Sequence, residues 1–312
     1  MPKRLLPLLL TTAAATCYAG AAAASTPGAC TQTTTAAATA CQNDAQDNYW
    51  IKIGVCANLA NATAAKKCRA DATANLADDR ATCGEQKVAR DQVCAAVGEA
   101  PYDPVINPAN FVDPADIGGS VAANPYFPLL RGRVWVYRNG TERITVTVTP
   151  RTRTILGVKV ATVRDVATDS GVVIEDTDDW YAQDKQGNVW YFGELSQKFV
   201  NGRIAGIDGS WTAGVEGGKA GIIMRAKPGV GAATYRQEFS LDNAEDMGEV
   251  LSLTGSATTP AASCSGTCLV TRDFTPIDPG NEENKYFSPG IGEILAVDPV
   301  TGDREELISF TP

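Results

Sequence analysis

"WYAQDKQGNVWYFGE", residues 180–194, places five aromatic residues around a single turn signal. The "DKQGN" in its middle puts a glycine where a type I turn followed by a glycine bulge requires a positive φ. With that turn, Tyr181 faces Tyr191 across one side of a hairpin, and Trp180 faces Phe192 across the other. Both sides are apolar and rich in aromatic surface. A hairpin buried on both faces predicts a sandwich, a barrel or a curved half-barrel.

The segments around this hairpin also alternate apolar and polar residues. "RVWVYRNG", "RITVTVT" and "KVATVRDV" precede it, separated by the turn signals "NG" and "LG". Near the C-terminus, "EILAVD" and "EELISF" flank a turn at Gly302. The glycine-rich stretch 209–231 lacks the spacing and the hydroxyl of a phosphate-binding loop, so we interpret it as a loop over the sheet or at a pocket mouth. We therefore predict a mainly antiparallel β domain over residues 124–312.

The cysteines predict a second, helical unit before the β domain. Six of them lie between residues 30 and 94, and three nested pairs share one midpoint, as neighbours across two antiparallel segments do. The residues between them, mostly Ala, Gln, Asp, Lys and Arg, favour helix. We predict an αα-hairpin over residues 25–100, with its turn near "NLANAT" and the disulfides Cys56–Cys68, Cys41–Cys83 and Cys30–Cys94. The alternatives are local pairs or a metal site, but no Cys-x-x-Cys motif occurs.

The predicted fold class is thus α+β: a disulfide-stapled antiparallel αα-hairpin followed by a curved sheet, half-barrel or barrel. Residues 101–123, with four prolines and the pair Gly118–Gly119, are interpreted as an extended linker laid along the surface rather than a folded unit. A further disulfide is expected within "CSGTC", where the spacing favours a structural bond over a redox motif. Its cysteines are Cys264 and Cys268.

Alanine dominates the seam of the predicted hairpin, so the two helices bury little apolar surface against each other. Each disulfide could then contribute about 3 kcal/mol by restricting the unfolded chain. Larger apolar residues follow one another near the end of the first arm, and we expect them to pack against the β domain. The alternative is packing against a partner protein. These residues are Tyr49, Trp50, Ile51, Ile53 and Val55.

Acidic residues crowd around the aromatic hairpin. In "IEDTDD", strand alternation puts Asp176 and Asp178 on one face and Glu175 and Asp179 on the other. Two such carboxylates beside aromatic rings could act as acid and base on a sugar, or could ligate calcium. Acids on exposed strand faces are common, so a solvated surface is the favoured interpretation. The candidate ligand face consists of Asp176, Asp178, Asp179, Trp180, Tyr181, Tyr191 and Glu194.

The chain contains no histidine. This excludes Ser-His-Asp and Cys-His nucleophilic catalysis, the usual catalytic zinc sites and His-ligated haem. No G-x-S-x-G motif occurs either. We therefore predict no catalytic residue, no metal ligand and no cofactor.

The N-terminus is typical of an export signal over residues 1–24. Lys3 and Arg4 precede the apolar run "LLPLLL", which is too short to span a membrane, and a stretch of small residues follows. "AATC" lacks the residues of a good lipobox, so we expect signal cleavage after Cys17 rather than a lipid anchor on it. The predicted location is secreted or periplasmic.

The charge balance limits the partners. The formal net charge is −9, and removal of a signal with two positive and no negative charges leaves −11. This argues against a nucleic acid or an anionic membrane as a partner.

Several motifs resemble a group of exported bacterial proteins of unknown function. They are "NPYFPLLRG…WVYR", "DDWYAQDKQGNVWYFGE", "GSWTAGVEGGKAGIIM", "YRQEFSLDNAEDMGEVL" and "ENKYFSPGIGEILAVD". The opening and closing motifs are also similar to those of bacterial lipoproteins with strongly curved antiparallel sheets. The resemblance covers most of residues 124–310 and implies an exported bacterial protein with a curved sheet or partial barrel. It implies no catalytic residues.

Three functions fit these observations. The first is a non-enzymatic binding or interaction protein of the bacterial cell envelope, with a small-molecule or glycan ligand and with the helical hairpin available to a protein partner. The second is a carboxylate-dependent enzyme acting on extracellular polysaccharide. The third is a structural surface protein that assembles through the hairpin. The absence of a catalytic motif favours the first.

Overall fold

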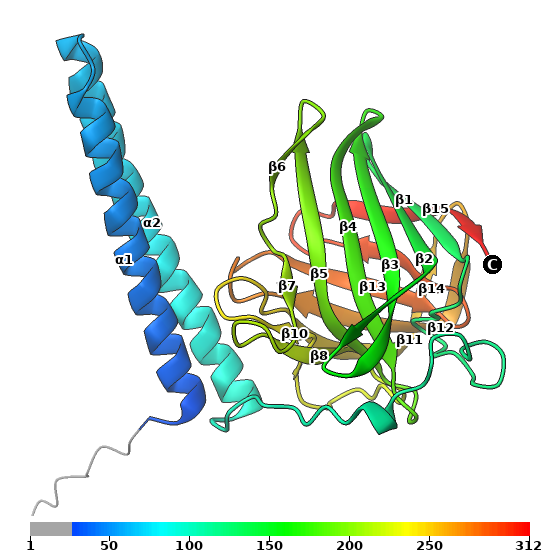
Figure 1. The fold of residues 1–312 in the computed structure, drawn as a ribbon. Helices are drawn as coiled ribbons and strands as arrows, with labels where there is room; N and C mark the ends of the chain where they lie inside the picture. Colours follow the sequence, from blue (N-terminus) through cyan, green and yellow to red (C-terminus); the bar gives the residue numbers. More distant parts are fainter. Residues whose placement is uncertain (1–26) are drawn as a thin grey trace, which may run out of the picture.

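The computed structural model describes residues 27–312, so the predicted signal peptide and Cys17 lie outside the described residues. The chain forms a long helical hairpin followed by a strongly curved, nearly closed antiparallel sheet (Figure 1). The α+β prediction, with a disulfide-stapled hairpin before a barrel-like β domain, is confirmed.

The hairpin consists of α1 (Ala29–Ala57) and α2 (Ala62–Val97). Asn61 caps α2, because its side chain accepts a hydrogen bond from the Ala64 amide at 2.9 Å. Little apolar area is buried between the helices, since the buried seam is largely alanine and cysteine. The predicted disulfides Cys30–Cys94, Cys41–Cys83 and Cys56–Cys68 are all present and staple the two helices along their length. The fourth, Cys264–Cys268, is also present.

The large apolar residues of α1 do not pack against the β domain, so that expectation is wrong. Trp50 and Ile51 are 61% and 59% exposed. They lie near the free end of the hairpin, which projects away from the sheet (Figure 1). The hairpin meets the β domain with its other end, where the chain enters α1 and leaves α2.

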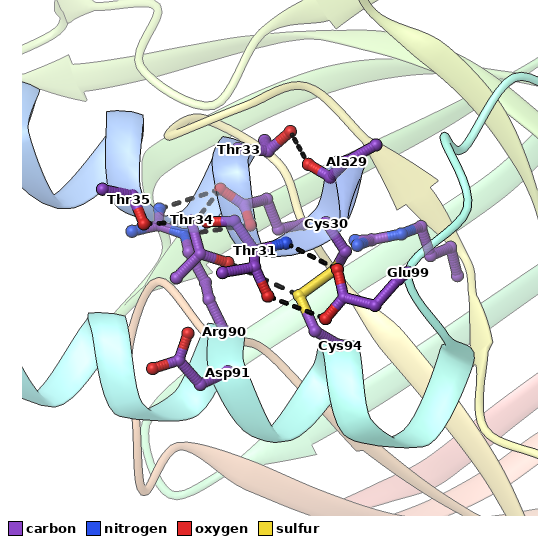
Figure 2. Close-up of a disulfide and its surroundings, with 12 residues drawn as sticks. Ala29, Cys30, Thr31, Thr33, Thr34, Thr35, Arg90, Asp91, Cys94 and Glu99 are labelled. Atoms are coloured by element: carbon purple, nitrogen blue, oxygen red, sulfur yellow. Dashed lines mark hydrogen bonds and ion pairs between the residues drawn. A yellow bond between two sulfur atoms is a disulfide. The ribbon is translucent and has the colours of Figure 1, made fainter. Parts of the chain in front are cut away.

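The base of the hairpin is fixed to the β domain by a buried ion pair. Arg90 is 3% exposed, and its Nη2 lies 2.8 Å from Glu245 Oε1 and 3.0 Å from Asp242 Oδ1. Higher up α2, the Gln86 side chain donates to the Ile277 carbonyl at 2.6 Å. Figure 2 shows the base itself, where Glu99 receives hydrogen bonds from the amide and hydroxyl of Thr31 beside the Cys30–Cys94 disulfide.

The β domain is one fifteen-stranded sheet in which every pairing between strands is antiparallel, in the order β10-β8-β5-β4-β3-β2-β1-β15-β14-β13-β12-β11-β9, with β6 and β7 paired to β5. A short 3₁₀ helix, η1 (Pro108–Asn110), precedes it. The strands are β1 Val134–Asn139, β2 Glu142–Ile155, β3 Val158–Asp169, β4 Val172–Gln183, β5 Val189–Val200, β6 Arg203–Gly206, β7 Trp211–Thr212, β8 Lys219–Met224, β9 Tyr235–Arg236, β10 Glu238–Phe239, β11 Met247–Thr258, β12 Ser263–Phe274, β13 Glu282–Ser288, β14 Gly292–Val297 and β15 Arg304–Thr311.

One five-residue segment, 235–239, brings the two edges of the sheet together. Its first two residues, β9, pair with β11 at one edge, and its last two, β10, pair with β8 at the other. Between them, the Gln237 amide donates to the Asp246 carbonyl at 2.8 Å. The sheet therefore has an inner face, enclosed by its own curvature, and an outer face.

The aromatic hairpin of β4 and β5 contributes to both faces. Tyr181 and Tyr191 are paired in register as predicted, with ring centroids 4.7 Å apart. The predicted pair of Trp180 with Phe192 coincides instead with a bulge, because the register shifts between Asp179 and Tyr181. A glycine follows Phe192 at this bulge, with φ of 124°, and the backbone of β7 comes too close there for any Cβ.

The predicted linker covers the outer face of this hairpin. Phe111 packs edge-on against Trp190 and Phe192, with ring centroids 6.1 and 5.5 Å away. The Trp190 Nε1 donates to Asp184 Oδ2 at 3.0 Å. Ile106 and Phe111 of this segment pack against a second apolar cluster of the β domain.

Replacing Trp190 with Ala should destabilise the β domain by about 3 kcal/mol, because the change removes packing against Phe111 and leaves Asp184 without its indole donor. Equilibrium urea unfolding of the two proteins measures the difference. Lys185→Ala, at the exposed turn of the same hairpin, is the control and should change stability by less than about 0.5 kcal/mol. An unchanged midpoint for Trp190→Ala would contradict the packing described here.

Candidate binding cavity

The inner face of the sheet surrounds a cavity of about 370 Å³. This volume falls within the range of small-molecule sites in proteins. Side chains from both halves of the sheet line it, and the segment before β1 contributes as well. The side chains that line the cavity include Phe127, Leu129, Asp165, Asp179, Tyr181, Asp273, Glu283, Lys285, Glu293 and Glu305.

Part of the wall is apolar, and a short segment before β1 holds it in place. Asn124 anchors that segment: its amide donates to Gln183 Oε1 at 2.8 Å, and its Oδ1 accepts from the Tyr126 and Phe127 amides. Phe127 then packs edge-on against Tyr181, with ring centroids 5.0 Å apart. This wall offers an apolar surface to a ligand.

A first acidic group lies on β3, β4 and β5 and consists of Asp165, Asp179 and Glu194. The bulge in β5 explains the position of Glu194, because the extra residue turns its side chain to the face that carries Tyr191. Asp179 Oδ1 accepts a hydrogen bond from the Tyr191 hydroxyl at 2.6 Å. No lysine or arginine within residues 27–312 forms an ion pair with any of the three carboxylates.

The surroundings of these carboxylates favour their protonated forms. Burial, followed by the charge of Asp179, raises the pKa of Asp165 to about 8 and that of Glu194 to about 8. Burial also raises the pKa of Asp179 to about 7, although the hydroxyls of Tyr191 and Tyr181 oppose the shift. All three therefore change charge close to neutral pH.

A second charged group lies on β12 to β15 and contains a lysine. Lys285 Nζ lies 3.5 Å from Glu283 Oε2 and 3.6 Å from Asp273 Oδ2. Burial lowers the pKa of Lys285, but the neighbouring acids outweigh that effect and raise it. Burial raises the pKa of Glu293 to about 8 and that of Glu305 to about 7, with the charge of Lys285 opposing both shifts. Lys285 therefore stays charged and offsets part of the acidity.

The structure divides the seven residues of the candidate ligand face between the two sides of the sheet. Asp176 and Asp178 lie outside, ion-paired to Arg164 and Arg151 at 2.5 Å each. Trp180 also lies outside, with the Arg153 guanidinium 4.1 Å from its ring centroid. Asp179 and Tyr181 line the cavity, and Tyr191 and Glu194 lie next to Asp179 on the same face.

Sequence reasoning missed the inward-facing charges of the other strands. Asp165 lies two residues after Val163, and residues two apart in a strand point to the same face of the sheet. The inward position of Asp165 was therefore predictable from strand alternation. Lys285, Glu293 and Glu305 lie more than a hundred residues further on, and nothing local in the sequence places them opposite Asp165. They come near Asp165 because β1 pairs with β15, which joins the strands of the two halves of the chain in one curved sheet.

Within residues 27–312, no group of three or more Cys, Asp or Glu side chains is arranged to hold a metal ion. Among the same residues, none of the helices combines the length and the apolarity needed to cross a membrane. The four disulfides indicate an oxidising, extracytoplasmic environment.

No protein-family model, curated protein or solved structure matches this chain. The resemblance to exported bacterial proteins with curved sheets therefore stays a prediction.

Proposed function

We propose that the protein is a non-enzymatic binding protein of the bacterial cell envelope, secreted or periplasmic, whose cavity holds a small molecule with a cationic group and an apolar body. The observation that carries the proposal is the first acidic group: Asp165, Asp179 and Glu194 lie close together, and no lysine or arginine of residues 27–312 forms an ion pair with them. Buried like charges repel, and a bound cation would relieve that repulsion.

The two walls of the cavity fit the two ends of such a ligand. Six carboxylates and one lysine line the cavity, so its field favours a positive group. Tyr181 stands next to these acids and can face a cation with its ring. Phe127 and Leu129 form the apolar wall, against which the body of the ligand would be buried. A neutral glycan would use the tyrosines but would leave the carboxylates unpaired.

The location is supported by the disulfides and by the signal-like N-terminus. Four disulfides persist in an oxidising compartment. N-terminal sequencing of the exported protein tests the location: we expect a mature chain that starts near residue 25. A chain that retains Met1 in the cytoplasm would contradict it.

Isothermal titration with two probes of matched shape tests the ligand class. We expect 4-phenylbutylamine to bind at about pH 8.5, where the cavity acids are ionised, and to bind at least about ten-fold more weakly at about pH 6, where they hold protons. The amine stays charged across this range, so the change reports on the protein. 5-Phenylpentanoate, a carboxylate of similar size, should not bind.

Two variants locate the binding. Asp179→Asn should weaken the amine about ten-fold or more, whereas Asp178→Asn, one residue away on the outer face, should leave it unchanged. Equal affinity for amine and carboxylate, or equal effects of the two variants, would contradict the proposal.

One observation favours the enzymatic alternative as a second proposal. Asp179 is hydrogen-bonded to Tyr191 and has a pKa of about 7, which suits a group that accepts and donates protons at neutral pH. Of the acids first considered for such work, Asp176 and Asp178 are occupied by arginines outside the sheet. Release of reducing ends from bacterial polysaccharide that is lost in Asp179→Asn would support an enzyme.

A further inference from the structure

The free end of the helical hairpin has a surface that the proposed function does not use. We define the hairpin tip as residues 49–69, the last two turns of α1, the connecting turn and the start of α2. Four large apolar side chains are exposed on it: Trp50 at 61%, Ile51 at 59%, Val55 at 53% and Leu59 at 41%. The first three lie on the last turns of α1, and Leu59 lies in the connecting turn.

The charge of the hairpin tip is opposite to that of the whole chain. The hairpin tip contains four basic residues and no acidic one, whereas the chain has a net charge of −9. Lys67 is paired with Asp71 at 2.7 Å. Lys52, Lys66 and Arg69 are exposed and form no ion pair within residues 27–312. The argument from net charge against an anionic membrane therefore does not hold for this end of the molecule.

The hairpin tip is held rigidly at a distance from the β domain. The 29 residues of α1 extend for about 43 Å. The Cys56–Cys68 disulfide closes the tip, and the buried Arg90–Glu245 pair holds the opposite end of the hairpin. The acidic β domain is thus kept well back from the basic tip (Figure 1).

We propose that the hairpin tip docks on the surface of a lipid bilayer that contains anionic headgroups. Trp50 and Ile51 would enter the boundary between headgroups and acyl chains, where tryptophan is favoured. Lys52, Lys66 and Arg69 would contact the headgroup phosphates. The β domain would then stand off the membrane at the far end of the hairpin.

A second copy of the chain fits this surface less well. Two tips brought together would place their unpaired cations against each other, which is unfavourable. Four apolar side chains also cover much less than the roughly 800 Å² per partner that a stable protein interface buries. Charge complementarity therefore favours the lipid surface over self-association.

Co-sedimentation with vesicles tests the proposal, using the full disulfide-bonded chain. We expect the protein to sediment with vesicles of phosphatidylcholine and phosphatidylglycerol at about three to one, and to be released by high salt. Pure phosphatidylcholine vesicles should retain at least about ten-fold less. This arm separates the anionic headgroup from the bilayer as such.

Two tip variants and two matched controls locate the contact. Trp50→Ser with Ile51→Ser, and separately Lys52→Glu with Lys66→Glu, should each reduce partitioning about ten-fold or more. Val88→Ser, which is 57% exposed on α2 outside the tip, and Lys227→Glu, exposed on the β domain, should leave it unchanged. Circular dichroism confirms that the variants keep their helices, which the disulfides hold independently of these side chains.

Three results would overturn the proposal. One is the absence of binding to the phosphatidylglycerol vesicles. Another is binding that the tip variants retain. The third is a dimer in sedimentation equilibrium that dissociates in Trp50→Ser with Ile51→Ser, since the tip would then be occupied by a second copy.

Discussion

Arg90→Ala should cost about 3–5 kcal/mol at the junction between the hairpin and the β domain, because it leaves the carboxylate of Glu245 buried without its partner. Both side chains are almost completely buried, at 4% and 3% exposed, and the guanidinium makes several hydrogen bonds to Glu245. The three disulfides keep the hairpin folded, so the loss should appear as undocking. Limited proteolysis at the linker, combined with calorimetry, measures it.

A double variant separates the ion pair from the local packing. Arg90→Met with Glu245→Leu removes both charges and should recover most of the lost stability. Arg80→Ala, on an exposed turn of the same helix, should change stability by less than about 0.5 kcal/mol. A single calorimetric transition at the unchanged temperature in Arg90→Ala would show that the pair does not hold the hairpin.

The second large effect is a loss of stability as the pH rises from about 5 to about 8.5. Asp165, Glu194 and Glu293 have pKa values of about 8 in the folded protein, well above the ordinary values of carboxyl groups. Above pH 5 the unfolded chain has already released these protons, while the folded chain still binds them. The unfolded state therefore binds fewer protons, and the free energy of unfolding falls until the folded groups ionise near pH 8.

Asp165→Asn isolates one of these groups. At about pH 8.5 it should raise the free energy of unfolding by about 2 kcal/mol, and at about pH 5 it should leave it nearly unchanged. This change in the free energy of unfolding is much smaller than the whole pKa shift of Asp165 would give, because Asp165 is only half-buried and faces the cavity. Asp176→Asn, on the outer face and paired with Arg164, should cost about 0–1 kcal/mol at either pH. Stability that is equal at both pH values in the unmodified protein would contradict the buried acids.

The pairing of the cysteines was predictable from the sequence because it depends on symmetry about one turn. The placement of Asp176 and Asp178 on one face of the sheet and of Asp179 on the other was also predictable, because side chains alternate between the two faces along a strand. The pairing of Tyr181 with Tyr191 followed from the turn at Gly187, which has the expected positive φ of 94°. Each of these inferences uses residues that are close in the chain.

The features that the sequence did not predict depend mostly on contacts between residues that are distant in the chain. The bulge after Phe192 shifts Glu194 to the inner face, and its cause is the close approach of β7, not a signal within the hairpin. Asp165 on β3 and Glu293 on β14 line the same cavity because β1 pairs with β15, a contact between residues far apart in the chain. The position of Trp50 could have been inferred from connectivity, since the linker leaves the hairpin at its base, about 40 Å from the tip.

The proposed binding of a cationic molecule at the inner face of the sheet can be observed in a crystal. A crystal structure of the chain soaked with 4-phenylbutylamine at about pH 8.5 tests it most directly. We expect density for the probe inside the cavity, with its nitrogen at hydrogen-bonding distance from Asp165 or Asp179 and its ring against Phe127 and Leu129. A cavity filled only with ordered water, or a probe bound solely on the outer surface, would show that the cavity is not a site for cationic molecules.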